Sequence, residues 1–391
     1  MVYPKDDPSG VRVLDLRGYE EYEEDNKPII YQENATRAMQ DIGLDYTTNE
    51  DKNKIIYVIL PSNCRITNEV FKEFNNLQIV YNLNKCRSVG YNAFSSCYSL
   101  SNSNLSNCEY IGSEAFRWSS ITFSNLKKCT FIGYDAFTNC TSLVNIDCSN
   151  AVLDDLSFYN CTGLKTIKIK PGIDIPNHTF ELCENLQTVY NLNKSSKIGE
   201  FAFYGTKKLS NKDLFGVTYF DKCCFSDSNL LGAKINKNAK IASSDPVYNN
   251  YSAFAYSNLD KIEIAYNYDH DDHYVLNYCY NLKYIKIPKG MYIPDEFFSD
   301  RETVDEIKGR TIYNFKYISH LGGWNLCSVK LTNNTILISD PGEIHSNAFT
   351  NCLNTEWNLP NLTTRQVIDK NYFGANVGVI FHCKDGDVTV P

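Results

Sequence analysis

One short segment concentrates side chains that could bind a metal ion. Residues 269–273 read Asp-His-Asp-Asp-His, which places two imidazoles and three carboxylates within five residues. Histidine nitrogens suit zinc, and carboxylate oxygens suit calcium. A polar loop between structural units has the same composition, and no CxxC pair accompanies the segment. We therefore expect a polar loop and no cofactor; His270, Asp272 and His273 would be the ligands if a metal bound here.

The 15 cysteines could form disulfides or supply a nucleophile. Six share one position, three residues after a recurring phenylalanine: Cys97, Cys140, Cys161, Cys183, Cys279 and Cys352. Thr206 and Phe74 occupy the same position elsewhere, which a required cross-link would not allow. Buried cysteine behaves as a small hydrophobic residue, so we expect unpaired core thiols, with occasional disulfides between neighbouring units left open. Such thiols are poor candidates for nucleophiles.

Other signs of catalysis are missing from the sequence. It contains no Gly-rich phosphate loop, no HExxH and no Gly-x-Ser-x-Gly, and the histidines outside residues 269–273 are scattered. An enzyme needs a nucleophile or an acid/base pair gathered near a pocket. We therefore expect that the protein is not an enzyme.

The elements that position these side chains repeat along the chain. In residues 132–148 the apolar positions fall three or four apart and then alternate, which predicts a short helix followed by a short strand. The unit recurs about every 22 residues, aligned on one aromatic or leucine position: Phe71, Phe94, Phe116, Phe137, Phe158, Phe180, Phe203, Phe225, Phe254, Leu276 and Phe298. This period predicts an α/β solenoid in which each unit packs only against its neighbours.

The repeat also indicates a family. The pattern Ile-Gly-x-x-Ala-Phe-x-x-Cys-x-x-Leu-x-x-Ile-x-Ile, as in residues 132–148 and 153–169, resembles the BspA-like leucine-rich repeats of bacterial and protist surface proteins. The resemblance covers about three quarters of the chain. It implies a leucine-rich-repeat solenoid with a parallel sheet on one face. It also implies a role in adhesion or binding at the cell surface or after secretion.

The repeat pattern divides the chain into four parts. Residues 1–60 do not repeat and are expected to form an N-terminal cap or an attachment segment. Residues 61–310 form the regular array, and residues 311–360 contain degenerate repeats. Residues 361–391 end in two predicted strands around an Asp-Gly turn, a hairpin that would cap the last unit. The N-terminus is polar and acidic, so no signal peptide is visible.

The predicted sheet face is the candidate ligand surface. In each strand the third and fifth residues of Leu-x-x-Ile-x point away from the core. The candidate binding residues are Tyr81, Phe123, Asn145, Asp147, Thr166, Lys168, Thr188 and Tyr190. The same rule places Lys234, Lys261, Glu263, Tyr284 and Lys286 outward in later units. Tyrosine and phenylalanine are enriched in interfaces, although ordinary solvated strands have a similar composition.

Charge and hydropathy limit the partners. The net charge of −8 and the lack of a dense Lys/Arg run argue against nucleic acid. No apolar run approaches the roughly 20 residues that span a bilayer, so we expect no membrane insertion. We expect a non-enzymatic protein that binds a protein or glycan through the sheet face. The alternative is a structural or receptor-binding component of a bacterial virus particle, docked through the N-terminal segment.

Overall fold

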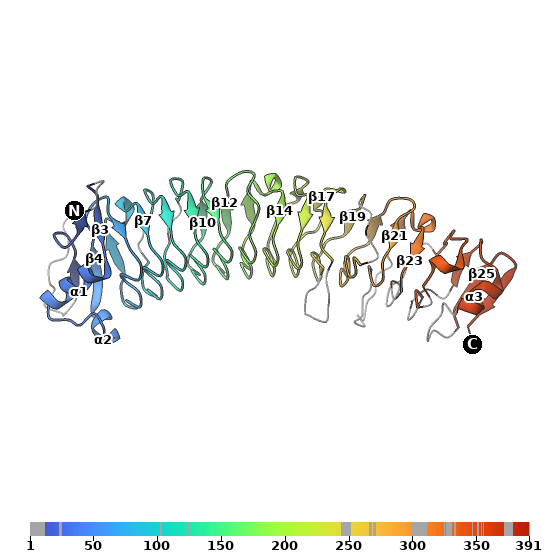
Figure 1. The fold of residues 1–391 in the computed structure, drawn as a ribbon, viewed down its shortest axis with the longest axis horizontal. Coiled ribbons are helices and arrows are strands. Elements are labelled where there is room, and N and C mark those ends of the chain that lie inside the picture. Colours follow the sequence, from blue (N-terminus) through green and yellow to red (C-terminus); the bar gives the residue numbers. More distant parts are fainter. Residues whose placement is uncertain are drawn as a thin grey trace. The chain divides into compact units, whose positions relative to one another are not determined.

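The chain forms two compact units, and each is described by itself. Unit 1 comprises Met1–Ser195 with Gly205–Leu209, and unit 2 comprises Ser196–Tyr204 with Ser210–Pro391. The computed structural model describes residues 12–22, 26–101, 104–122, 125–243, 252–265, 268, 271–298, 311–323, 325, 331, 334–345, 347–349, 352, 354, 356–370 and 378–390. Figure 1 shows that each unit is a stack of similar coils. The boundaries predicted at residues 60, 310 and 360 stay predictions.

Unit 1 carries two sets of strands on its coils. One set forms a seven-stranded sheet in the order β11-β9-β8-β7-β5-β3-β2, parallel except for the pair β2 and β3. Its strands are β2 (Glu21–Tyr22), β3 (Pro28–Ile30), β5 (Arg65–Ile66), β7 (Ser88–Val89), β8 (Tyr110–Ile111), β9 (Phe131–Ile132) and β11 (Val152–Leu153). The other set forms the parallel sheets β1-β4-β6 and β10-β12-β13. Their strands are β1 (Arg12–Asp15), β4 (Ile55–Ile59), β6 (Ile79–Tyr81), β10 (Asn145–Asp147), β12 (Thr166–Lys168) and β13 (Thr188–Tyr190).

The predicted helix of each unit is wrong. The residues around Ala136-Phe137 form successive turns, and residue 132, assigned to a helical face, lies in strand β9. Asp135 and Asn139 have φ values of 59° and 60°, in the left-handed region that an α-helix excludes. The three-and-four spacing of apolar residues is therefore produced by turns, which also bring a side chain inward every few residues.

Hydrogen bonds between coils replace the bonds of a helix. The amide of Phe137 donates to Ser157 O at 2.9 Å, and the amide of Asn139 donates to Tyr159 O at 2.9 Å, both in the next coil. The amides that alternate with these close turns within the coil, as Thr138 N does with Asp135 O at 3.3 Å and Cys140 N with Phe137 O at 3.0 Å. Buried backbone groups need partners, and this alternation satisfies them without a helix.

The core of unit 1 is a column of stacked phenylalanine rings. Centroids of successive rings lie 5.1–5.9 Å apart from Phe71 to Phe180, and these rings have no exposed surface. Where a glycine precedes the turn, it allows neighbouring coils to approach, because a Cβ on Gly133 would lie 2.6 Å from Ser113 N and one on Gly112 would lie 2.8 Å from the carbonyl carbon of Gly90. The Ile-Gly part of the repeat therefore has a steric cause.

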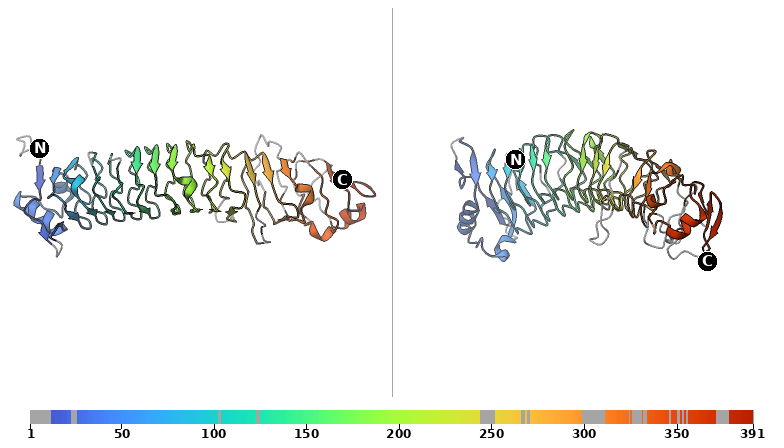
Figure 2. Two further views of the ribbon diagram at one scale, coloured as in Figure 1. Left: turned by 90° about the horizontal axis from the view of Figure 1, so that it is seen from above. Right: turned by 45° about the vertical axis from the view of Figure 1, so that its right-hand side comes forward.

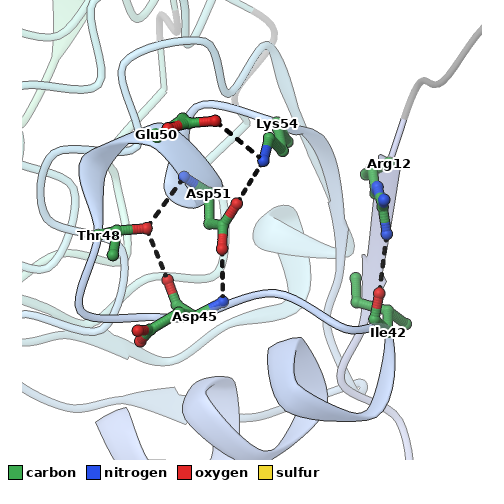
Figure 3. A network of polar contacts seen from close by, with 7 residues as sticks. All are labelled: Arg12, Ile42, Asp45, Thr48, Glu50, Asp51 and Lys54. Carbon is green, nitrogen blue, oxygen red and sulfur yellow. Dashed lines mark hydrogen bonds and ion pairs between the residues drawn. The ribbon is translucent and has the colours of Figure 1, made fainter.

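The N-terminal residues continue the sheets of unit 1. Strands β1 and β3 pair in parallel with β4 and β5, and helices α1 (Gln32–Asp41) and α2 (Asn49–Lys52) lie beside them, in blue in Figures 1 and 2. A polar network holds this segment together (Figure 3). Arg12 donates to Ile42 O at 2.8 Å, while the Asp51 carboxylate accepts from Asp45 N at 2.8 Å and from Lys54 Nζ. The polar contacts lie within the segment, and the pairing of β3 with β5 and of β4 with β6 joins it to the repeats; whether it acts as a cap or as an attachment segment stays a prediction.

Unit 2 uses the same coil with shorter sheets. These are β14-β16-β18, β15-β17, β19-β20-β22, β21-β23 and β24-β25-β26. The strands are β14 (Lys197–Ile198), β15 (Asp213–Leu214), β16 (Tyr219–Phe220), β17 (Lys234–Ile235), β18 (Lys240–Ile241), β19 (Lys261–Glu263), β20 (Tyr284–Lys286), β21 (Tyr292–Ile293), β22 (Thr311–Tyr313), β23 (His320–Leu321), β24 (Glu356–Leu359), β25 (Ile380–Cys383) and β26 (Gly386–Thr389). Strands β25 and β26 form the expected antiparallel hairpin, and helix α3 (Thr364–Lys370) contacts β26.

Short 3₁₀ helices follow some strands. They are η1 (Leu83–Lys85), η2 (Leu192–Lys194), η4 (Phe315–Tyr317) and η5 (Pro341–Glu343). The first three each begin after an asparagine in the left-handed region, whose side chain donates to the preceding coil, as Asn191 Nδ2 does to Ile169 O at 2.8 Å. None of the helices in the described part of the chain has the length and apolar character needed to cross a membrane.

Candidate functional site

The sheet β10-β12-β13 of unit 1 presents two outward rows of side chains. Its three strands are parallel and in register, so Ile146, Ile167 and Val189 form one buried row. Side chains alternate along a strand, so the residues on either side of this row point outward. One outward row is Asn145, Thr166 and Thr188, and the other is Asp147, Lys168 and Tyr190. The repeat thus aligns an acid, a base and a phenol on consecutive strands.

Polar contacts fix several of these side chains. Thr166 Oγ1 donates to Asn145 Oδ1 at 2.7 Å, and Lys127 Nζ lies 3.6 Å from Asp147 Oδ2. Partial burial of Asp147 favours the neutral acid, but hydrogen bonds from Ser149 and the charges of Lys127 and Lys168 outweigh it. Together they lower the pKa of Asp147 below its ordinary value. Asp147 is therefore an anion at neutral pH.

These side chains surround a shallow hollow of about 360 Å³. It is lined by Asn145, Ile146, Asp147, Thr166, Lys168 and Tyr190. The Tyr190 side chain is 54% exposed, although large aromatic residues are usually buried. An exposed ring beside an amide, a hydroxyl and two opposite charges can bind a ligand that has both polar and apolar groups. We call this group of six residues the unit 1 hollow.

The structure brings together five of the eight predicted binding residues. Asn145, Asp147, Thr166, Lys168 and Tyr190 line the unit 1 hollow. Thr188 lies in the same sheet, in register with Thr166, but does not line the hollow. Tyr81 ends β6 in the separate sheet β1-β4-β6, with its ring 6.3 Å from that of Tyr57. Phe123 lies outside the described residues. Whether any of these residues binds a ligand stays a prediction.

The metal candidate is only partly within the described residues. His270 lies outside them, while Asp272 and His273 lie inside. His273 Nδ1 is 3.2 Å from Asp295 O, which gives this nitrogen a backbone partner. In the parts of the chain that the structure describes, no three His, Cys, Asp or Glu side chains are grouped as metal ligands.

The cysteines of the described residues are free thiols, as predicted, and 12 of the 14 are buried. Four of the six in the repeated position donate to the phenylalanine carbonyl of the preceding coil, with distances of 2.9 Å for Cys140 to Phe116 O and 3.0 Å for Cys161 to Phe137 O; Cys97 and Cys183 do the same. Burial raises the pKa of Cys140 and of Cys183 to about 12. These thiols therefore stay neutral and support the core.

Sequence reasoning missed three features of the surface. It assigned one strand to each unit, so it did not foresee the second sheet, where exposed Tyr110 stacks on Phe131 at 5.4 Å. A hollow of about 550 Å³ beside this sheet is lined by Glu33, Arg65 and Tyr110 among others. It also missed Phe215 and Tyr313 in unit 2. Tyr313 could have been found, because Thr311-Ile-Tyr-Asn-Phe repeats Thr188-Val-Tyr-Asn-Leu.

Comparison with known proteins identifies the repeat. Three stretches match the sequence model of the BspA type leucine rich repeat region in six copies, over residues 48–154, 109–232 and 236–320. No curated protein matches the chain.

Several solved structures are similar at low identity. A leucine-rich repeat protein from Bacteroides ovatus is 18% identical, with a TM-score of 0.49 over 85% of this chain and 84% of its own. A leucine rich cell surface protein from Faecalibacterium prausnitzii is 18% identical, with a TM-score of 0.42 over 91% and 93%. The T. pallidum leucine rich repeat protein is 20% identical, with a TM-score of 0.39 over 54% and 93%.

Proposed function

Because this chain belongs to the BspA-type leucine-rich repeat family, we propose that it is a non-enzymatic binding protein that recognises a protein or glycan partner through the unit 1 hollow. Leucine-rich repeat proteins generally bind other proteins, and their stacked units offer an extended surface for this purpose. The family also supports a location at the cell surface or outside the cell. A role in a virus particle stays a prediction with no observation that favours it.

The row Asp147, Lys168 and Tyr190 carries the proposal. The ring of Tyr190 offers a large contact area at a small entropy cost, and such residues dominate binding energies. Asp147 and Lys168 in the adjacent strands offer an acceptor and a donor, and Asn145 and Thr166 add two further polar groups. Short polar side chains around one ring suit hydroxyl and amide groups, which both glycans and protein backbones present.

The non-enzymatic part of the proposal is supported by the state of the thiols. The strongest nucleophile type in the sequence is cysteine, and burial raises the pKa of Cys129 to about 11 and that of Cys140 to about 12. A thiol with such a pKa is almost entirely protonated at neutral pH, so it does not attack a substrate.

A binding screen with matched variants tests the proposal. The purified full chain is applied to a glycan array and to immobilised fibronectin, laminin and collagen, and Kd is measured for each ligand retained. We expect the double variant Tyr190→Ala with Lys168→Ala to weaken at least one interaction tenfold or more, since hot-spot truncations commonly cost that much. The array and the matrix proteins separate the glycan and protein alternatives.

The control is Tyr98→Ala. The exposed fraction of Tyr98, 53%, nearly equals that of Tyr190, and Tyr98 lies in a turn outside the hollow. Equal binding by wild type, the double variant and the control, for every ligand retained, would show that the hollow does not bind. Turnover of a retained ligand would contradict the non-enzymatic role.

A further inference from the structure

Unit 2 repeats the row of the unit 1 hollow. Strands β19, β20 and β22 are parallel and in register, and they align Glu263, Lys286 and Tyr313. The order is again an acid, a base and a tyrosine on consecutive strands, as for Asp147, Lys168 and Tyr190. Tyr313 is 52% exposed, nearly the same as Tyr190. The same arrangement has therefore been built twice in one chain.

The row in unit 2 lines a hollow of about 430 Å³. We call it the unit 2 hollow; its lining residues are Phe215, Ala233, Lys234, Ile235, Lys261, Ile262, Glu263, Tyr284, Lys286 and Tyr313. Its three aromatic residues are each about half exposed or more, at 62% for Phe215, 49% for Tyr284 and 52% for Tyr313. Solvent-exposed aromatic rings gathered in one place mark interaction surfaces.

The charge of the unit 2 hollow favours anions. Lys286 Nζ lies 2.8 Å from Glu263 Oε1, so these two charges offset each other. Lys234 and Lys261 are exposed, and neither forms an ion pair with an acid within the described residues. Asp213, the register partner of Lys234 on the adjacent strand, is an acidic neighbour of that lysine but does not line the hollow. The lining residues therefore carry three lysines against one carboxylate, a local positive charge in a chain whose net charge is −8.

The hydrogen-bonding groups favour a peptide over a sugar. The lining residues include no asparagine, glutamine, serine or threonine, and their one carboxylate is engaged by Lys286. The lining lysines can donate hydrogen bonds to a sugar but cannot accept them, so apart from the two tyrosine hydroxyls the hollow offers few acceptors for the many hydroxyl groups of a neutral sugar. A peptide with carboxylates and an aromatic side chain would pair its charges with Lys234 and Lys261 and bury its ring against Tyr284 and Tyr313.

We propose that the unit 2 hollow is a second binding site, which takes an acidic, aromatic-containing peptide segment of a protein partner. The lysines attract the carboxylates and set the rate of association, and the rings retain the segment. This site has its own ligand chemistry, so the proposal does not depend on binding at the unit 1 hollow.

The test uses the full chain and a glutamate–tyrosine copolymer as the probe. We expect the wild type to bind it, and Lys234→Glu with Lys261→Glu to weaken binding at least tenfold. We expect Tyr284→Ala with Tyr313→Ala to weaken it about as much. Affinity should fall as salt rises, because the contacts at the rim are screened. Any binding of a lysine–tyrosine copolymer, which the net charge of −8 attracts, should not be weakened by Lys234→Glu with Lys261→Glu.

The matched control is Lys85→Glu with Lys194→Glu. These residues end η1 and η2, are exposed, lie outside both hollows and bring the same change in charge. Equal weakening by the control would show a non-specific charge effect and overturn the proposal. So would the absence of copolymer binding by wild type. Hyaluronate is an acidic polysaccharide without aromatic groups. If it binds the wild type as tightly as the copolymer or more tightly, the ligand of the unit 2 hollow is an acidic glycan and the peptide proposal is wrong. Tyr190→Ala should leave copolymer binding unchanged, which separates this site from the first.

Discussion

The unit 1 and unit 2 hollows share a framework and differ in chemistry. Both are built on three parallel strands in register, with a carboxylate, a lysine and an exposed tyrosine in one row. The unit 1 hollow surrounds its ring with an amide and a hydroxyl, at Asn145 and Thr166. The unit 2 hollow has Lys261 and Tyr284 at the same register positions.

This difference shows how a repeat protein can change its ligand without changing its fold. The inward row is Ile146, Ile167 and Val189 in one sheet, and it is equally apolar in the other, where Ile262, Ile285 and Ile312 are buried. Burial of this row determines which side chains point outward, because a strand alternates. The outward positions do not pack in the core, so their charge and hydrogen-bonding capacity can differ between units.

The largest expected effect is a loss of stability in core variants, which tests whether the cores of the two units are equivalent. Phe137→Ala in unit 1 and Phe225→Ala in unit 2 each remove a fully buried ring that is stacked on both sides. Each should lower the free energy of unfolding by about 3–5 kcal/mol, through lost burial and the cavity left behind. Urea denaturation followed by circular dichroism measures both.

The control for these variants is Phe215→Ala, because Phe215 is 62% exposed. It should change stability by less than about 0.5 kcal/mol, as exposed substitutions usually do. If Phe137→Ala or Phe225→Ala unfolds at the same urea midpoint as wild type, the stacked rings do not stabilise that unit.

A transplant tests whether the two register positions explain the difference in ligand. Asn145→Lys with Thr166→Tyr gives the unit 1 hollow the side chains of Lys261 and Tyr284. In a chain that also carries Lys234→Glu and Lys261→Glu, we expect the transplant to restore binding of the glutamate–tyrosine copolymer about tenfold, near 1.4 kcal/mol. Fluorescence anisotropy gives the Kd of the copolymer for this chain with and without the transplant. If the two Kd values are equal, features outside these two register positions determine the ligand.

The sequence predicted the repeat and much of the hollow because both depend on regular spacing. Burial of Ile146 follows from alternation, and this alone places Asn145 and Asp147 outward. The helix prediction was wrong because apolar spacing of three or four also arises from consecutive turns. The spacing of apolar residues does not reveal that Asp135 and Asn139 have positive φ values, which an α-helix excludes. The contribution of Phe215 could not be predicted, since this residue lies in a turn after β15, outside the strand pattern.

A smaller effect is expected where the two units support their turns differently. In unit 1 Cys140 Sγ donates to Phe116 O of the preceding coil, at 2.9 Å. At the same repeat position in unit 2, Ser257 Oγ donates to Phe254 O of its own coil, at 2.6 Å. Cys140→Ala and Ser257→Ala should each cost about 1 kcal/mol, the net value of one hydrogen bond. Urea midpoints measure the cost, and a loss as large as that of Phe137→Ala would reveal a further role for the thiol.

The smallest effect concerns the acid of the unit 1 row. Folding lowers the pKa of Asp147, so its carboxylate stabilises the folded state above the unfolded pKa of about 3.9, and this contribution is lost as pH falls through the folded value. The Asp147 side chain is 24% exposed, so solvent still screens its charge and limits its contribution to about a few tenths of a kcal/mol. Asp147→Asn should therefore be slightly less stable than wild type at pH 7 and equal to it near pH 2, as measured by thermal unfolding at both values. A difference that persists at pH 2 would mean that Asp147 acts through packing. In that case the matching acid in unit 2, Glu263, would be the better guide to the role of the row, because its carboxylate is engaged directly by Lys286 at 2.8 Å.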